Sequence, residues 1–197
     1  MIAIIDYGMG NLRSVQKACE FVGHKAIVTS SPTEIEEASH VILPGVGAVR
    51  DALYNLKEKG LWQSALDAAH SGKPFLGICL GMQMLFDRSL ENGCYDCLGL
   101  IGGQVVPFDV KGLRVPHMGW NSLSVKENPL ISQGEKYVYF VHSYHAADVA
   151  EENIIATSHY GYPFVAAVQK GNIFGCQFHP EKSGDVGIEI IKNFGGM

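Results

Sequence analysis

The residue best suited to nucleophilic chemistry is a cysteine held between two glycines, in the segment Gly77-Ile78-Cys79-Leu80-Gly81. The segment stands where an apolar strand pattern gives way to a helical pattern, which is typical of a nucleophile elbow. Such a turn strains its central residue, and we expect the glycines to be needed because a β-carbon there would collide with neighbouring elements. We expect the sulfur to be exposed above the sheet at a helix N-terminus, where partial positive charge favours a thiolate. On this segment alone, a buried structural thiol remains an alternative.

A histidine and a glutamate two residues apart supply the partners that such a thiol needs. In Phe178-His179-Pro180-Glu181, an extended backbone would place His179 and Glu181 on one side, and Pro180 disfavours helical geometry at His179. The imidazole can take the thiol proton and return it to a leaving amine, while the carboxylate fixes the ring tautomer. A lone His-x-Glu is more often a surface pair. Together with the cysteine segment it predicts a triad of Cys79, His179 and Glu181.

Backbone donors for an oxyanion are predicted in two places. The N–H of Leu80 directly follows the nucleophile, where the oxyanion donor of an elbow lies. The second place is Pro44-Gly45-Val46-Gly47, after another apolar strand pattern. The two glycines let a peptide unit turn its N–H toward the elbow without steric cost, and both loops would lie beyond the carboxyl ends of parallel strands. We therefore assign Val46, Gly47 and Leu80 to an oxyanion hole.

The remaining histidines and cysteines give weaker signals. His117, His142 and His145 fall in strand patterns and are interpreted as core or rim residues. Cys94 and Cys97 have C-x-x-C spacing, but no second pair follows at ligand spacing, so we expect two solvent-facing loop thiols. We predict no metal and no other cofactor.

Periodicity and turn residues predict an α/β fold. The first half alternates buried apolar strands with helices, which favours an open, mostly parallel sheet with helices on both faces. The second half has strand patterns joined by turns, including a hairpin at 170–172, and predicts an antiparallel extension. The expected strands are Ile2–Ile5, Lys25–Thr29, His40–Leu43, Pro74–Cys79, Val105–Phe108, Gly119–Val125, Tyr137–His145, Ile154–His159, Phe164–Gln169 and Ile173–Phe178. Four helices are expected. The first begins after a capping Asn11, the second ends near Gly72, the third runs from about Gly81 to Leu90, and the last spans Asp185–Phe194.

Length and charge limit the function classes. The chain has 197 residues, 47% of them hydrophobic, and a formal net charge of -5. We expect one domain, residues 1–197, with a substantial core. Neither the net charge nor any run of Lys and Arg favours nucleic-acid binding. The longest apolar stretch is broken by glycines and too short to span a bilayer, so no membrane partner is expected. Five cysteines, an odd number in a chain of this size, favour a reducing cytoplasm.

These elements together resemble the class I (triad) glutamine amidotransferases. The segments 77–83, Gly-Ile-Cys-Leu-Gly-Met-Gln, and 178–181, Phe-His-Pro-Glu, match the two signatures of that family in order and spacing. Further segments resemble one group within the family, the glutaminase subunits of imidazole glycerol phosphate synthases. These segments are Ile5–Ser14, Pro44–Ala48, Pro116–Asn121, Tyr139–Tyr144 and Lys182–Ser183.

The resemblance implies a flavodoxin-like domain that hydrolyses L-glutamine. Cys79 would form a glutamyl thioester, and Gln83 would hold the α-amino or carboxylate group of glutamine. The backbone of Gly47, Ser143 and Tyr144 would contact the same ligand. The ammonia would pass to a (β/α)8-barrel cyclase subunit, the partner in a heterodimer, which makes imidazole glycerol phosphate and aminoimidazole carboxamide ribonucleotide in histidine biosynthesis.

The resemblance also makes the Gly45–Gly47 peptide a two-state element that the ligand of the cyclase would control. One departure is visible, because Val49 and Arg50 stand where the resemblance implies an aromatic residue and then a small one. A cysteine sensor on the same scaffold would not need the His-x-Glu pair, and a peptidase or deglycase would not need Gln83. An anthranilate or guanylate enzyme would share the triad but not the Pro116–Asn121 segment.

Overall fold

Five parallel strands form the part of the sheet on which the site is built. In the computed structural model, which describes residues 1–197, they lie in the order β2-β1-β3-β4-β13. Every residue of β1, β3, β4 and β13 is buried, as expected of parallel strands covered on both faces. Their bounds are Ile2–Ile5 (β1), Ala26–Thr29 (β2), His40–Leu43 (β3), Phe75–Ile78 (β4) and Ile173–Cys176 (β13).

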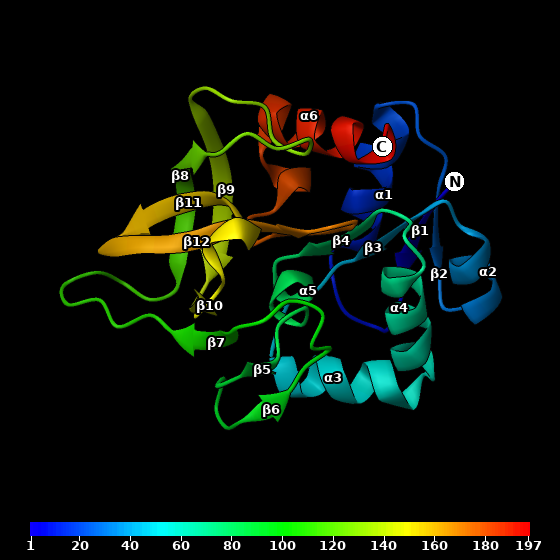
Figure 1. Ribbon diagram of the computed structural model, residues 1–197, viewed down its shortest axis with the longest axis horizontal. Coiled ribbons are helices and arrows are strands. Elements are labelled where there is room, and N and C mark those ends of the chain that lie inside the picture. Colours follow the sequence, from blue (N-terminus) through cyan, green and yellow to red (C-terminus); the bar gives the residue numbers. More distant parts are fainter.

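Alternate side chains of these strands pack against different helices. Ala3 and Ile5 pack in a core that includes α2, α3, α4 and α5, whereas Ile2 and Ile4 pack in a second core with α1 and α6. Figure 1 shows α1 and α6 on one side of the sheet and α3 and α4 on the other. The period of two along each strand thus produces the two covered faces that the sequence predicted. The helices are Leu12–Phe21 (α1), Pro32–Glu37 (α2), Val49–Glu58 (α3), Leu61–His70 (α4), Leu80–Gln83 (α5) and Gly184–Gly195 (α6).

The second half of the chain extends the sheet with antiparallel strands. β12 pairs with β13, and β11, β8 and β9 follow in a twisted extension at the left of Figure 1. The predicted parallel sheet with an antiparallel extension is therefore confirmed, as is the hairpin at 170–172. The remaining elements are Arg88–Ser89 (β5), Tyr95–Asp96 (β6), Gln104–Pro107 (β7), His117–Val125 (β8), Lys136–His142 (β9), Tyr144–Ala147 (β10), Ile154–Tyr160 (β11) and Tyr162–Lys170 (β12), with 3-10 helices at Glu151–Asn153 (η1) and Pro180–Lys182 (η2).

The predicted helix from Gly81 to Leu90 is wrong, because α5 ends at Gln83. The carbonyl groups of Met84, Leu85 and Phe86, which a longer helix would use, instead accept hydrogen bonds from the backbone of residues 98–101. The chain then enters β5, which pairs with β7. Long-range backbone pairing thus overrides the local helical pattern.

One predicted strand is divided in the structure, and one helix was missed. The expected strand Tyr137–His145 is divided at Ser143 into β9 and β10. Helix α2 was not predicted, although Ser31 caps it by accepting a hydrogen bond from the backbone N–H of Glu34. Ser31 with Pro32 and Glu34 is a helix-start signal that the sequence did contain.

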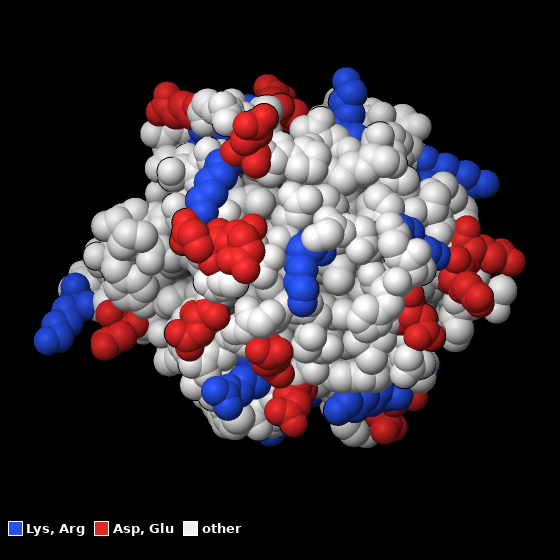
Figure 2. Space-filling view, viewed as in Figure 1, with Lys and Arg blue, Asp and Glu red and all other residues white.

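The charge on the surface and the length of the helices are relevant to binding of nucleic acid and of membranes. On the face drawn in Figure 2, acidic and basic side chains are interspersed and leave a broad uncharged area between them. None of the helices has the length and apolar character needed to cross a membrane.

Candidate functional site

Cys79 lies at the turn between β4 and α5 in a conformation that side chains rarely adopt. Its φ is 55° and its ψ is -108°, a strained region that costs about 1 to 3 kcal/mol. A β-carbon on Gly77 would lie 2.7 Å from the carbonyl oxygen of Gly81, and one on Gly81 would overlap with the carbonyl oxygen of Leu43. The structure therefore shows the strain and the need for both glycines that the sequence predicted.

The sulfur of Cys79 lies at the bottom of a pocket and not on an open surface. The residue is only 6% exposed, so the expectation of an exposed sulfur is wrong. The loops that follow β3 and β9 wall the pocket, whose volume is about 470 Å³, and so cover the turn. It brings together every residue predicted for the site except Glu181, which lies behind His179. Its lining is Val46, Gly47, Cys79, Leu80, Gln83, Glu91, Asn92, Val141, His142, Ser143, Tyr144 and His179.

His179 and Glu181 form the predicted pair, by a backbone route that differs from the expectation. The Nδ1 atom of His179 lies 2.8 Å from Oε1 of Glu181, and each side chain is 1% exposed. His179 itself is extended, as the following proline favours. Residues 180–182 then form the 3-10 helix η2, so an extended segment is not what aligns the two side chains. The carboxylate accepts from Nδ1–H, which leaves Nε2 without a protein partner.

The charge on His179 depends on its two neighbours. Burial lowers the pKa of His179, but the interactions with the nearby Cys79 sulfur and with the Glu181 carboxylate outweigh it and raise the pKa to about 9. A histidine with such a pKa holds a proton near neutral pH. The arrangement can therefore keep the proton taken from a thiol and deliver it to a leaving group.

Asn11 contacts Glu181, a role that the sequence did not predict for it. Its Nδ2 atom donates a hydrogen bond to Oε1 of Glu181 at 3.2 Å. The predicted capping of α1 by the Asn11 side chain is wrong, because that side chain makes no cap hydrogen bond. Asn11 and Glu181 are 170 positions apart, and no local pattern predicts such a contact.

The predicted oxyanion donors are not all free in this conformation. The backbone N–H of Leu80 donates to the carbonyl oxygen of Gly45 at 3.3 Å. The hydroxyl of the fully buried Tyr7 donates to the carbonyl of Pro44 at 2.8 Å and so holds the start of this loop. Burial raises the pKa of Tyr7, and the charge of Cys79 adds to that increase. Gly47 has a φ of 96°, a conformation that favours glycine.

Gln83 faces both the pocket and the core. Its Nε2 atom donates to the carbonyl oxygen of Tyr144 at 3.0 Å and to Oε1 of Gln177 at 2.9 Å. Gln177 is fully buried, and its Nε2 atom lies 3.7 Å from the sulfur of Cys79. No motif in the sequence pointed to Gln177, although it stands two residues before His179.

The histidines of the antiparallel half are core residues, as predicted. His117, His142 and His145 are each less than 10% exposed and surround Phe108. Burial lowers the pKa of His117 to about 4 and that of His142 to about 3, so both are neutral near pH 7. Nδ1 of His142 donates to the carbonyl of Tyr144 at 2.8 Å, which holds the peptide that lines the pocket.

The two C-x-x-C thiols do not share one environment. Cys94 is exposed, as expected, but Cys97 is buried, so the expectation of two solvent-facing thiols is wrong for Cys97. The apolar neighbours of β6 enclose Cys97, and burial raises the pKa of its thiol to about 12. A thiol of that kind is unreactive at neutral pH.

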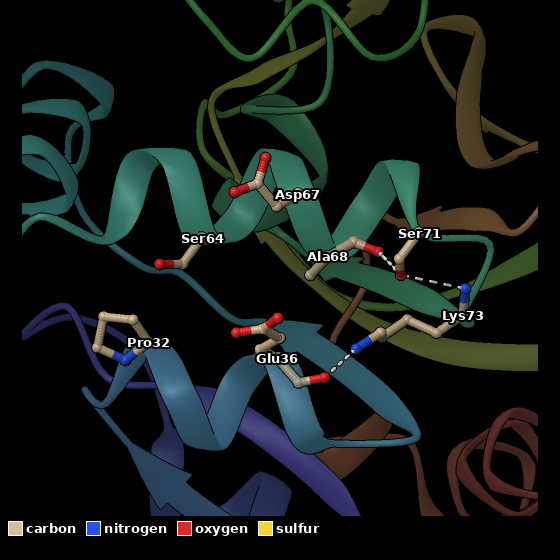
Figure 3. A pocket seen from close by; sticks show the side chains of 7 residues that line it. All are labelled: Pro32, Glu36, Ser64, Asp67, Ala68, Ser71 and Lys73. Atoms are coloured by element: carbon tan, nitrogen blue, oxygen red, sulfur yellow. Dashed lines mark hydrogen bonds between the residues drawn. The ribbon is translucent and has the colours of Figure 1, made fainter.

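A second hollow, of about 360 Å³, lies on the outer surface between α2 and α4 (Figure 3). Glu36 points its carboxylate toward α4, whereas the carboxylate of Asp67 points away from α2, and Lys73 closes one end by donating to the backbone carbonyl of Glu36 at 2.6 Å. Its seven lining residues include no cysteine or histidine. It therefore lacks the pairing of a cysteine with a histidine that the Cys79 pocket contains.

Comparison with known proteins gives matches along almost the whole chain. The family model for glutamine amidotransferase class-I matches residues 3–195. The chain is 52% identical to the imidazole glycerol phosphate synthase subunit HisH of Geobacter metallireducens, over 98% of this chain and 96% of that protein. It is 50% identical to the subunit of the same name from Desulfitobacterium hafniense, over 99% of this chain and 93% of that protein.

The fold has counterparts among solved structures. A chain in the structure of PurLQS from Thermotoga maritima superposes with a TM-score of 0.79 at 22% identity, over 98% of this chain and 96% of that chain. This likeness supports the flavodoxin-like fold alone. The family match and the identities near 50% decide the assignment: the chain belongs to the class I glutamine amidotransferase family, among the imidazole glycerol phosphate synthase subunits named HisH.

Proposed function

We propose that this chain hydrolyses L-glutamine to glutamate and ammonia through a thioester on Cys79, and supplies the ammonia to a cyclase subunit. One observation carries the proposal: Cys79, at its strained turn, and His179 line the same pocket, and Glu181 holds the Nδ1 atom of the His179 ring. That set of groups provides a nucleophile, a proton carrier and an orienting carboxylate.

The proposed reaction has two stages. The sulfur of Cys79 attacks the side-chain carboxamide carbon of glutamine, and the C–N bond breaks as His179 gives its proton to the departing ammonia. Water then attacks the thioester carbon while His179 accepts a proton from it. The C–S bond breaks, and glutamate leaves with the enzyme restored. Each stage passes through an oxyanion that needs backbone donors, for which we assign Leu80 with the Val46 and Gly47 peptides.

The loop that follows β3 must move for this oxyanion hole to form. The carbonyl of Gly45 now accepts the N–H of Leu80, so that donor is available only after the Gly45–Val46 peptide rotates. Gly45 has no side chain to restrict its ψ, one of the two torsions that this rotation changes. We therefore propose that the chain alone is a slow glutaminase and that the partner subunit favours the rotated state.

The contacts of Gln83 indicate which end of glutamine it would hold. Both N–H groups of its amide are used by Tyr144 and Gln177, so the oxygen remains for the substrate. An oxygen acceptor suits the α-ammonium group and not the α-carboxylate. The backbone of Ser143, Tyr144 and Gly47 would complete the contacts with glutamine.

The partner is proposed to be a (β/α)8-barrel cyclase that makes imidazole glycerol phosphate and aminoimidazole carboxamide ribonucleotide in the cytoplasm. Relatives near 50% identity are named as subunits of imidazole glycerol phosphate synthase. Met118, Trp120 and Tyr137, on β8 and β9, are each at least half exposed. Large apolar side chains at such exposure are typical of protein interfaces.

Ammonia delivery is tested by replacing the nucleophile in the assembled enzyme. We expect Cys79→Ala to abolish glutamine-dependent synthesis with a purified cyclase and to leave ammonium-dependent synthesis unchanged. Cys94→Ala, which removes an exposed thiol outside the pocket, is the matched control. Glutamate release by wild type, with and without the cyclase, reports the dependence on the partner. Glutamine hydrolysis by a folded Cys79→Ala variant, or none by the wild-type complex, would refute the proposal.

A further inference from the structure

A buried amide outside the predicted triad approaches the sulfur of Cys79. The Nε2 atom of Gln177 lies 3.7 Å from it, within the range of N–H donation to sulfur, and Gln177 is 0% exposed. We propose that Gln177 stabilises the Cys79 thiolate by donating this hydrogen bond. The inference rests on the proposed role of Cys79 as nucleophile and adds to the reaction a residue that touches the reacting atom.

The direction of the hydrogen bond follows from its neighbours. The side-chain atom of Gln83 that meets the carbonyl oxygen of Tyr144 must be a nitrogen, because a carbonyl accepts only. The same nitrogen lies 2.9 Å from Gln177, so the Gln177 atom facing it must be the oxygen. The nitrogen of Gln177 is then the atom left to face the sulfur. The carbonyl of Tyr144 thus fixes the orientation of the Gln177 amide through the amide of Gln83.

The two contacts of the sulfur favour different protonation states. The carbonyl oxygen of Val141 lies 3.9 Å from the sulfur and can only accept from the protonated thiol. The amide of Gln177 can donate to the deprotonated sulfur, and a hydrogen bond to a charged group is stronger than one to a neutral group. Because Gln177 is fully buried, no water competes for its N–H. Gln177 therefore favours the thiolate, whereas the carbonyl of Val141 favours the protonated thiol.

The test measures the reactivity of the sulfur without glutamine or a partner. The rate of alkylation of Cys79 by iodoacetamide is followed from pH 5 to 10 by mass spectrometry of its peptide, in wild type and in Gln177→Met. Loss of one hydrogen bond to a thiolate predicts a rise of about one unit in the midpoint pH of the rate, and about tenfold slower alkylation at low pH. The exposed Cys94 is an internal reference in the same digest. Gln63→Met, on the exposed face of α4, controls for the substitution itself.

Other groups near the sulfur stay in place in this comparison. Tyr7, Cys176, His179 and Glu181 interact electrostatically with Cys79 or with its neighbours, and all are retained in Gln177→Met. A role limited to holding Gln83 would raise KM for glutamine and leave the midpoint pH unchanged. An unchanged midpoint in folded Gln177→Met would therefore overturn the proposal.

A second measurement needs no variant at position 177. In wild-type protein labelled with ¹⁵N, the side-chain amide resonance of Gln177 is expected to shift with the same midpoint pH as Cys79 alkylation. The shift should disappear in Cys79→Ser. A resonance that does not respond to the titration would overturn the proposal even if Gln177→Met fails to fold. Failure of glutamine hydrolysis in the wild-type complex would instead refute the proposed function and leave these two readouts intact.

Discussion

Replacing Glu181 with glutamine isolates the contribution of its charge to the protonation of His179. Glutamine has the shape of glutamate and keeps an oxygen that can accept from Nδ1 of His179 and from Asn11. The carboxylate lies 2.8 Å from the ring, and both side chains are 1% exposed, so solvent does not screen their interaction. Without the carboxylate, burial opposes protonation and only Cys79 favours it. We therefore expect the pKa of His179 to fall in Glu181→Gln.

The size of the effect on stability follows from the pKa of the folded protein. The pKa of His179 is raised from 6.5 to about 9, and at 1.36 kcal/mol per unit this corresponds to roughly 3 kcal/mol. Because the folded value is the higher one, this stabilisation is fully present below pH 6.5 and is lost as the pH rises through about 9. In Glu181→Gln the loss between pH 6.5 and 9 should shrink by about 1 to 2 kcal/mol.

The assay is urea unfolding followed by tryptophan fluorescence at half-unit steps from pH 6 to 9.5. Burial also raises the pKa of the Cys19 and Cys97 thiols, so they contribute their own loss at high pH. The difference between variant and wild type removes that common term. Glu152→Gln, which changes an exposed carboxylate on η1, should follow the wild-type curve. Parallel curves for Glu181→Gln and wild type would refute the reasoning about His179.

Two other substitutions probe how the site is held. Gly81→Ala should destabilise the protein by more than about 3 kcal/mol in urea unfolding, because the added β-carbon would overlap with the carbonyl oxygen of Leu43. Gly102→Ala should be tolerated, because a β-carbon there would lie no closer than 4.0 Å to any atom. Equal stability of the two variants would contradict the prediction. Asn11→Ala removes a hydrogen bond to Glu181 and should lower kcat for glutamine hydrolysis by the cyclase complex about tenfold with little change in KM, and an unchanged kcat would show that Asn11 does not position the carboxylate.

The grouping of Cys79, His179 and Glu181 could be predicted from the sequence because its signals are local. A cysteine between glycines at the end of a buried strand implies a strained turn, and His179 and Glu181 are close in the chain whatever the backbone does between them. Their distance of 2.8 Å agrees with the prediction, although a 3-10 turn and not an extended segment produces it. The buried strands were equally readable, because nearly every residue of β1, β3 and β4 is apolar.

By itself the sequence predicted a nucleophile at Cys79, a proton carrier at His179 and the alternation of strands and helices, since each prediction depends on residues within a few positions of one another. Only the tertiary structure decided what surrounds Cys79. Gln177 and Asn11 reach the site through contacts across 98 and 170 positions. The end of α5 at Gln83 depends on hydrogen bonds from residues 98–101. The N–H of Leu80 is occupied because the carbonyl of Gly45, in the loop that follows β3, accepts a hydrogen bond from it. Such contacts form when distant segments pack, and no local pattern encodes them.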